Sequence, residues 1–397
     1  MTIAPGTDSF DQTASHGDSR PVYLDCNATT PIEPAVLREV VEFLQGDFGN
    51  AGSRTHAYGQ RAKERVNRAR EEVAAVVGAK PDEVIFTSGA TESNNLAILG
   101  LEEIGRNTGR RHIITTQIEH KAVLEPVERL RDRGFDVTLL PPNRGGWVEP
   151  QSVADALRPD TLLVSVMAAN NETGVIQPIG AIADALESHD TYLHVDAAQA
   201  FGKLLDELRN SRIDMMSVSG HKLYAPKGIG ALILRRRGYR RIPLTPLTIG
   251  GGQERGLRSG TLPVALIAGL ATSATIAVRH HDSRTAHCIK LRDRLITALE
   301  PLNASFNGDL DRTMPHTLNF SVPGVDSEAA IVALKDLVAI SNGSACTSQS
   351  YDPSHVLVAM NLPDERIHGA LRFSWSHLTE EPDWMQVASR LQLIQHS

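Results

Sequence analysis

The sequence predicts an α/β protein whose larger part is a mostly parallel, seven-stranded sheet flanked by helices. Three observations support this fold class. Seven short runs rich in Val, Ile and Leu lack period-2 alternation, as expected for strands that are buried on both faces. Helical patterns separate these runs, which is typical of βαβ units. After about residue 262 the pattern changes, which predicts a second, smaller α+β domain.

The predicted strands and helices follow one another from residue 57 to residue 235. The strands span 84–88, 112–116, 137–141, 162–167, 192–196, 215–219 and 231–235. The helices span 57–77, 91–104, 121–133, 151–157 and 178–188. A sheet of this kind binds its ligand outside the carboxyl ends of its strands. The residues that follow each strand are therefore the candidates for chemistry.

The second part of the chain opens with a long helical stretch over 263–299. A strand at 318–322, a helix at 327–337, apolar segments at 355–360 and 370–375, and a final helix follow. We therefore expect four segments. They are a flexible tail over 1–20, an N-terminal segment over 21–32 that joins the small domain, a large domain over 33–280 and a small domain over 281–397.

Composition and charge exclude several classes of function. The chain has 397 residues, of which 41% are hydrophobic, enough for a sizeable core. Its net charge of −7 favours neither direct nucleic-acid binding nor binding to anionic membranes. The longest apolar run, 264–278, is shorter than the roughly 18–20 residues of a membrane span. The first 20 residues lack the apolar core of a signal peptide. We therefore expect a cytoplasmic protein.

The three cysteines are Cys26, Cys288 and Cys346. No pair has the C-x-x-C spacing of a zinc or redox site, so no metal site is expected. An odd and sparse number of cysteines argues against a disulfide framework and is typical of a reducing compartment.

Polar residues follow five of the predicted strands. Gly89, Ala90 and Thr91 come after the first strand and open a helix, an arrangement that suits a phosphate. Taken alone, these residues are more often an ordinary helix N-cap by Ser88 or Thr91. The other strand ends carry His120, Asn171, Asp196 and Lys222. A single polar residue of this kind is usually structural, but five strand ends in succession favour a functional site.

Pyridoxal phosphate needs a set of groups that this chain offers: Asp196, Lys222 and the Gly89–Thr91 turn that opens a helix. A lysine binds the cofactor's aldehyde, and a carboxylate pairs with the protonated pyridine nitrogen. A desolvated lysine beside a cofactor becomes nucleophilic at neutral pH, which makes Lys222 the candidate for covalent attachment. Ser219 and His221 flank Lys222 and are candidates for contacts with the phosphate.

Eight motifs between residues 22 and 383 together resemble those of cysteine desulfurases, pyridoxal-phosphate enzymes that remove sulfur from L-cysteine. They are LDxxATTP (24–31), TSGATESNNLAI (87–98), EHKAV (119–123), NNETG (170–174), HVDAAQ (194–199), SGHKLYxPKGIG (219–230), GGGQERGLRSGT (250–261) and SNGSACTS (341–348). The resemblance is to the group I branch of these enzymes, within class V of the aminotransferases. It implies the type I fold of pyridoxal-phosphate transferases.

The resemblance also implies roles for individual residues. Cys346 would be the nucleophile that takes up the sulfur as a persulfide, and His120 would stack on the cofactor ring and move protons. The other implied cofactor contacts are Ala90, Thr91, Asp196, Gln199, Ser219, His221, Lys222 and, toward the phosphate of a partner subunit, Thr261. Asn171 and Arg372 would hold the substrate carboxylate, to which a guanidinium offers a bidentate fork.

The same resemblance implies a homodimer with shared sites and a sulfur-acceptor protein. Iron–sulfur cluster assembly, tRNA thiolation and DNA phosphorothioation all draw on such enzymes, and these motifs serve all three. The alternatives are a selenocysteine lyase or another small-amino-acid enzyme with this cofactor, and a sulfur-relay scaffold without activity. A nicotinamide-dependent dehydrogenase is disfavoured because no G-x-G-x-x-G follows a strand.

The two remaining cysteines receive separate interpretations. Cys288 lies on a predicted helix and is interpreted as inert. Cys26 occupies a variable place in LDxxATTP near the expected mouth of the site, and we interpret it as structural. A second reactive thiol at this position is the alternative.

Overall fold

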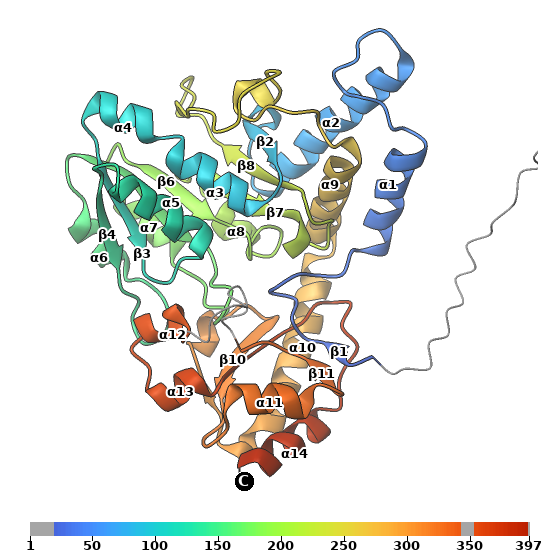
Figure 1. The fold of residues 1–397 in the computed structure, drawn as a ribbon, viewed down its shortest axis with the longest axis vertical. Coiled ribbons are helices and arrows are strands. Elements are labelled where there is room, and N and C mark those ends of the chain that lie inside the picture. Colours follow the sequence, from blue (N-terminus) through green and yellow to red (C-terminus); the bar gives the residue numbers. More distant parts are fainter. Residues whose placement is uncertain (1–19, 343–352, 396–397) are drawn as a thin grey trace, which may run out of the picture.

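The computed structural model describes residues 20–342 and 353–395, and a seven-stranded sheet forms its centre (Figure 1). The strands are β2 (Val84–Thr87), β3 (His112–Thr116), β4 (Asp136–Leu140), β5 (Thr161–Met167), β6 (Tyr192–Asp196), β7 (Met215–Ser219) and β8 (Gly230–Leu234). Their order is β2-β8-β7-β6-β5-β3-β4. Six of these strands run in the same direction, and β8 runs in the opposite direction. The predicted fold class and the seven strands are confirmed.

Helices cover both faces of this sheet. They are α1 (Pro34–Gln45), α2 (Ala57–Val76), α3 (Ala90–Leu99), α4 (Glu102–Thr108), α5 (Lys121–Arg131), α6 (Pro150–Ala156), α7 (Ile179–Ala185), α8 (Leu205–Leu208) and α9 (Val264–Arg279). On β2, Ile85 packs with α3 and α5, whereas Val84 and Phe86 pack with α2 and α9 on the opposite face. Each strand is thus apolar on both faces, which explains why the sequence lacks alternation.

The structure departs from the predicted helices at several places, and the short helix α8 is one that was not predicted. The prediction missed α1, which begins with a proline at its first position. The helix predicted over 91–104 is divided into α3 and α4, and the chain leaves α3 at Gly100, a residue that is a poor helix former. The long stretch over 263–299 is two helices, α9 and α10 (His281–Leu299), which meet at His280.

The C-terminal part of the chain builds a second core around a three-stranded antiparallel sheet. This sheet has the order β12 (Ala370–Ser374), β10 (Thr317–Ser321), β9 (Ser305–Phe306). It packs with α10, α11 (Ser327–Leu334) and α14 (Trp384–Gln395) around Phe320, Phe373 and Trp375. The shorter helices α12 (His355–Ala359) and α13 (Asp364–His368) lie in the same part.

The N-terminal segment joins this second core. Strand β1 (Val22–Tyr23) pairs with β11 (Val338–Ala339), and Leu24 is buried in the second core. The predicted domain boundaries stay a prediction, and the one at 280 lies at the residue between α9 and α10. Within the described ranges, every helix is too short or not apolar enough to cross a membrane.

A buried histidine joins three strands of the central sheet. His194 on β6 bonds Ser165 Oγ on β5 through Nδ1 (2.8 Å) and Ser217 Oγ on β7 through Nε2 (2.9 Å). Burial lowers the pKa of His194 to about 3. The ring is therefore neutral in the folded protein at any pH near neutrality.

We expect this histidine to make the fold sensitive to acid. The unfolded chain takes up a proton at His194 near a pH of about 6.5, whereas the folded protein does not until a pH of about 3. Stability therefore falls as the pH drops below about 6.5, and this group alone lowers the free energy of unfolding by about 2 kcal/mol at pH 5. Urea unfolding at pH 7.5 and pH 5 measures the loss. It should be smaller in His194→Gln than in the wild type; an equal loss in both proteins would contradict the assignment.

Candidate active site

The carboxyl ends of the central strands open on a cavity of about 480 Å³, a size typical of small-molecule sites. Nine of the predicted site residues line it: Ala90, Thr91, His120, Asn171, Asp196, Gln199, Ser219, His221 and Lys222. Arg372 and Thr261 do not line it. Cys346 lies outside the described residues. The sheet thus brings together residues from five separate strand ends, whose roles stay predictions.

Asp196 stands at the end of β6 with its carboxylate fixed by two donors. Asn94 Nδ2 donates to Oδ2 at 2.7 Å, and the amide of Ala198 donates to Oδ1 at 2.9 Å. Asn94 is fully buried on α3 and lines the same cavity. The sequence analysis missed Asn94, although it lies one helical turn after Thr91 and so projects from the same side of the helix.

Lys222 ends the short 3₁₀ turn that follows β7. Close packing demands a glycine at the start of this turn, because a Cβ at Gly220 would lie 2.8 Å from Cγ2 of Ile229. The Lys222 amine donates to the carbonyl oxygens of Asn27 and Ala28, the second at 2.7 Å. Backbone carbonyls therefore hold the amine at the cavity wall.

The N-terminus of α3 faces one end of the cavity together with Ser219 and His221. Burial, and then the charges of Lys222 and Lys227, lower the pKa of His221 to about 4, so its imidazole is neutral. Lys227 lines the same cavity, and the sequence analysis gave it no role. Its charge and the free amides of the helix make this end attractive to an anion.

His120 forms the N-cap of α5. Its Nδ1 accepts a hydrogen bond from the amide of Ala122 at 3.0 Å. A neutral ring with this acceptor carries its proton on Nε2. The contact fixes both the orientation of the ring and the nitrogen that holds the proton.

Asn27 connects the cavity with both cores. The residue is 2% exposed, and every polar group of its backbone and side chain has a partner. The partners are Ser374 Oγ (2.9 Å), the Asn171 carbonyl (3.0 Å), Thr317 Oγ1 (3.1 Å), Gln199 Nε2 (2.9 Å) and Lys222 Nζ. The sequence analysis treated this position as variable within LDxxATTP.

Arg372 lies behind the cavity wall at 1% exposure. Its Nη2 pairs with Asp25 Oδ1 at 2.6 Å, and its Nη1 donates to the Asn171 carbonyl at 3.1 Å. Its predicted contact with a substrate carboxylate stays a prediction. Asp25 is a partner that the sequence analysis did not find. Thr261 is exposed, and its predicted contact with a partner subunit also stays a prediction.

The two described cysteines are poor nucleophiles. Cys26 is 2% exposed and Cys288 is 5% exposed. Burial raises the pKa of Cys26 to about 11 and that of Cys288 to about 12, so both thiols stay protonated at neutral pH. These observations favour the structural interpretation of Cys26 over the reactive one.

The residues of the cavity fit pyridoxal phosphate. One carboxylate, one amine and an anion-attracting helix end lie around a single space of suitable size. Oε1 of Gln199 is buried and has no hydrogen-bond partner among the described atoms. Since buried polar atoms are nearly always paired, a hydroxyl group of a ligand is a suitable partner for this oxygen.

Comparisons with known proteins agree with this chemistry. The family model for class-V aminotransferases matches residues 22–384. The chain is 46% identical over 366 residues to the cysteine desulfurase IscS of Vibrio cholerae, covering 91% of this chain and 90% of that relative.

Two solved structures share the fold. A NifS-like protein superposes with a TM-score of 0.85 at 37% identity, covering 95% of this chain and 98% of the other. The crystal structure of DndA from Streptomyces lividans superposes with a TM-score of 0.79 at 52% identity, covering 88% of this chain and 98% of the other.

We expect Asn94→Ala to weaken the binding of pyridoxal phosphate. The variant removes a donor from a carboxylate that is implied to hold the ring nitrogen, and such a bond is worth about 1.5–3 kcal/mol. The dissociation constant should rise at least about tenfold. Absorbance titration of the cofactor-free protein measures it, with Asn95→Ala, a change at a half-buried neighbour outside the cavity, as the matched control. Equal constants for both variants would contradict the role of Asn94.

Proposed function

The chain belongs to the class-V aminotransferases, and within them to the cysteine desulfurases, and we propose that it removes sulfur from L-cysteine at the cavity described above. The products are L-alanine and a persulfide on Cys346. The observation that carries this proposal is the convergence of Asp196, His120 and Lys222 on one cavity that fits pyridoxal phosphate.

Pyridoxal phosphate supplies an aldehyde that binds amines and a ring that withdraws electrons. Lys222, whose amine is held at the cavity wall, would bind the aldehyde covalently. Asp196 would keep a proton on the ring nitrogen, and its two hydrogen-bond donors fix its carboxylate at the cavity. His120, which carries its proton on Nε2, would serve as the group that moves protons at the cofactor.

The remaining residues bind rather than react. The phosphate would be held by Thr91, Ala90, Ser219 and the neutral His221, and the nearby Lys227 would offset part of its charge. Gln199 would contact the ring hydroxyl. Asn171 and Arg372 receive the carboxylate of the substrate, and Asp25 keeps the guanidinium of Arg372 oriented.

The sulfur transfer balances without an external oxidant. The thiolate of Cys346 attacks the sulfur atom of the bound cysteine, so a sulfur–sulfur bond forms as the carbon–sulfur bond breaks. The carbon fragment takes up a proton and leaves as alanine. The outer sulfur of the persulfide then passes to a thiol of an acceptor protein.

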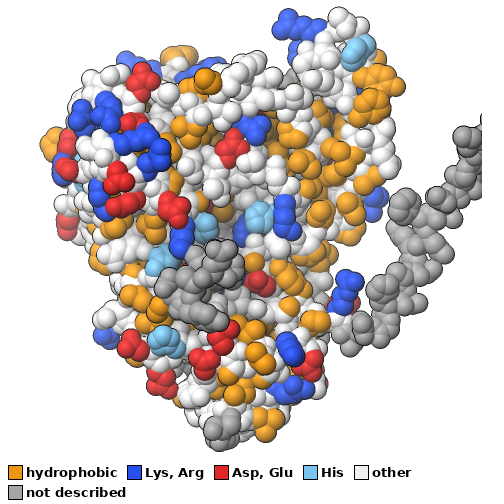
Figure 2. Space-filling view, viewed as in Figure 1, with side chains coloured by type: hydrophobic (Ala, Val, Ile, Leu, Met, Phe, Trp, Pro, Cys, Tyr) orange, Lys and Arg blue, Asp and Glu red, His pale blue; other side chains and the backbone are white. Residues whose placement is uncertain are grey.

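We propose that the chain acts as a homodimer. Apolar side chains on α1 and in the segment after it are exposed: Leu37 (48%), Val41 (38%), Leu44 (61%) and Phe48 (67%). Figure 2 shows hydrophobic side chains gathered on the side of the molecule where α1 lies. A contiguous apolar surface of this kind is typical of a protein interface. The exposed Thr261 is available to a partner subunit in such a dimer.

We expect Lys222→Ala to lose the covalent attachment of the cofactor. Borohydride treatment of the wild type should fix the cofactor on the peptide that contains Lys222, and mass spectrometry should find none on the variant. Lys80→Ala, which changes a lysine outside the cavity, is the control. Cofactor fixed to a different lysine in the variant would refute the assignment.

We expect Cys346→Ser to bind pyridoxal phosphate and L-cysteine but to form no persulfide. Serine keeps the size of the side chain and lacks the thiol. The measurement is sulfide release together with mass spectrometry of alkylated peptides. Cys26→Ser is the matched control and should form the persulfide, because the thiol of Cys26 is buried and protonated. Sulfide release by Cys346→Ser at the wild-type rate would exclude Cys346 as the nucleophile.

A further inference from the structure

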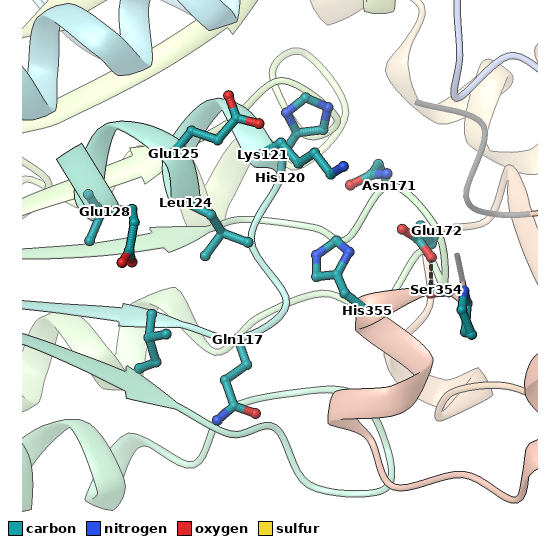
Figure 3. Close-up of a pocket in the computed structure, with 13 residues that line it drawn as sticks. Gln117, His120, Lys121, Leu124, Glu125, Glu128, Asn171, Glu172, Ser354 and His355 are labelled. Carbon is teal, nitrogen blue, oxygen red and sulfur yellow. Dashed lines mark hydrogen bonds between the residues drawn. The ribbon is translucent and has the colours of Figure 1, made fainter. Parts of the chain in front are cut away.

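A second cavity of about 620 Å³ lies beside the cofactor cavity and shares His120 and Asn171 with it (Figure 3). One side of it comes from α5 and the residues around it. The other side comes from Pro353, Ser354 and His355, the first described residues after the stretch that contains Cys346. At this cavity, the chain that follows the Cys346 stretch contacts residues at the edge of the central sheet.

Ser354 is bound to a buried carboxylate of the NNETG motif. Its hydroxyl donates to Oε2 of Glu172. Oγ of Ser354 also accepts from the amide of Leu357 at 3.2 Å, which caps α12. Glu172 is 4% exposed and Ser354 is 6% exposed. A hydrogen bond between a hydroxyl and a buried carboxylate is among the stronger ones in proteins, since water does not compete for it.

The backbone of Glu172 is itself held on both sides. The amide of Glu172 donates to Asn170 Oδ1 at 2.8 Å, and its carbonyl accepts from Asn319 Nδ2 on β10 at 3.1 Å. Glu172 thus has contacts with both cores of the protein. A partner fixed in this way leaves Ser354 little freedom to shift.

The neighbouring His355 also contacts a residue beside the cofactor cavity, here through a backbone carbonyl. Its Nε2 lies 3.0 Å from the carbonyl oxygen of Glu119, on the strand end that carries His120. Glu119 directly precedes His120 in the chain, and Glu172 directly follows Asn171. In both motifs one residue lines the cofactor cavity and its neighbour holds the returning chain.

The stretch is also fixed where it leaves the small sheet. Ser341 and Arg372 exchange backbone hydrogen bonds of 3.3 Å and 2.7 Å. Arg372 in turn donates to the carbonyl of Asn171. Both ends of the chain segment that carries Cys346 are therefore bound to residues next to the cofactor cavity.

We infer that Glu172 and Ser354 are positioning residues, which set the approach of Cys346 to the substrate sulfur through the hydrogen bond between them. The inference rests on the proposed role of Cys346. It explains why a polar pair is buried at this point, although neither side chain lines the cofactor cavity. A shift of about 1 Å in a reacting group can lower a rate by about 100-fold, so we expect loss of this anchor to slow sulfur transfer.

The test measures persulfide formation on Cys346 in a single turnover, by rapid quench after mixing with L-cysteine, alkylation and mass spectrometry. Ser354→Ala should slow this step by about 10- to 100-fold. The absorbance change on binding of L-cysteine should keep its wild-type midpoint, because the cofactor cavity is unchanged. Loss of that binding would show a general defect of the site and overturn the inference.

Two variants of the partner residue distinguish the hydrogen bond from packing. Glu172→Gln keeps an acceptor of the same size and should keep a rate near that of the wild type. Glu172→Ala should be as slow as Ser354→Ala, and the double variant no slower, because both changes remove one contact. If Ser354→Ala does not fold, the comparison of Glu172→Gln with Glu172→Ala decides the question.

Asp326→Ala is the matched control for the loss of a helix cap. Asp326 Oδ1 accepts from the amides of Glu328 and Ala329 at the start of α11, as Ser354 does for α12. This variant should form the persulfide at the wild-type rate. Wild-type rates in Ser354→Ala and Glu172→Ala would overturn the inference while leaving Cys346 as the nucleophile. No persulfide on Cys346 in the wild type would overturn the proposed function and this inference with it.

Discussion

The hydrogen bonds of Asn27 are the constraint on which the site depends. This buried residue binds Ser374 and Thr317 in the C-terminal part and accepts from Gln199 and Lys222 in the large one. The lysine, the ring-binding residues and the second core thus share one fixed point. Because each group that Asn27 pairs would otherwise be buried without a partner, the two parts of the protein have little freedom to move independently here.

Burial then decides which groups are available for chemistry. It keeps His221 uncharged at the end of the cavity that attracts an anion, and it keeps Cys26 and Cys288 protonated. Asp196 and Lys222 bring opposite charges to the same space, each held by hydrogen bonds from its own surroundings. Pyridoxal phosphate needs a carboxylate at one atom and an amine at another, and Asp196 and Lys222 offer these two groups at different places in the cavity.

Much of the site was predictable from the sequence because strand ends meet at one edge of a parallel sheet. Asp196 and Lys222 each follow an apolar run, so their proximity follows from topology alone. Asn27, Asn94 and Asp25 were not found, because their roles depend on contacts between residues up to 347 positions apart. The contact between Ser354 and Glu172 spans 182 positions and has no local signal either. Helix α1 was missed although it carries local signals, a proline at its first position and apolar residues such as Val36 and Val40 on one face.

The amounts of alanine and sulfide formed from L-cysteine test whether this site removes sulfur from its substrate. The purified chain is loaded with pyridoxal phosphate and given L-cysteine and dithiothreitol, and both products are measured over time. We expect equal amounts of alanine and sulfide, because one carbon–sulfur bond breaks for each alanine released. Pyruvate in place of alanine, or alanine without sulfide, would contradict a transfer of sulfur from cysteine to an enzyme thiol.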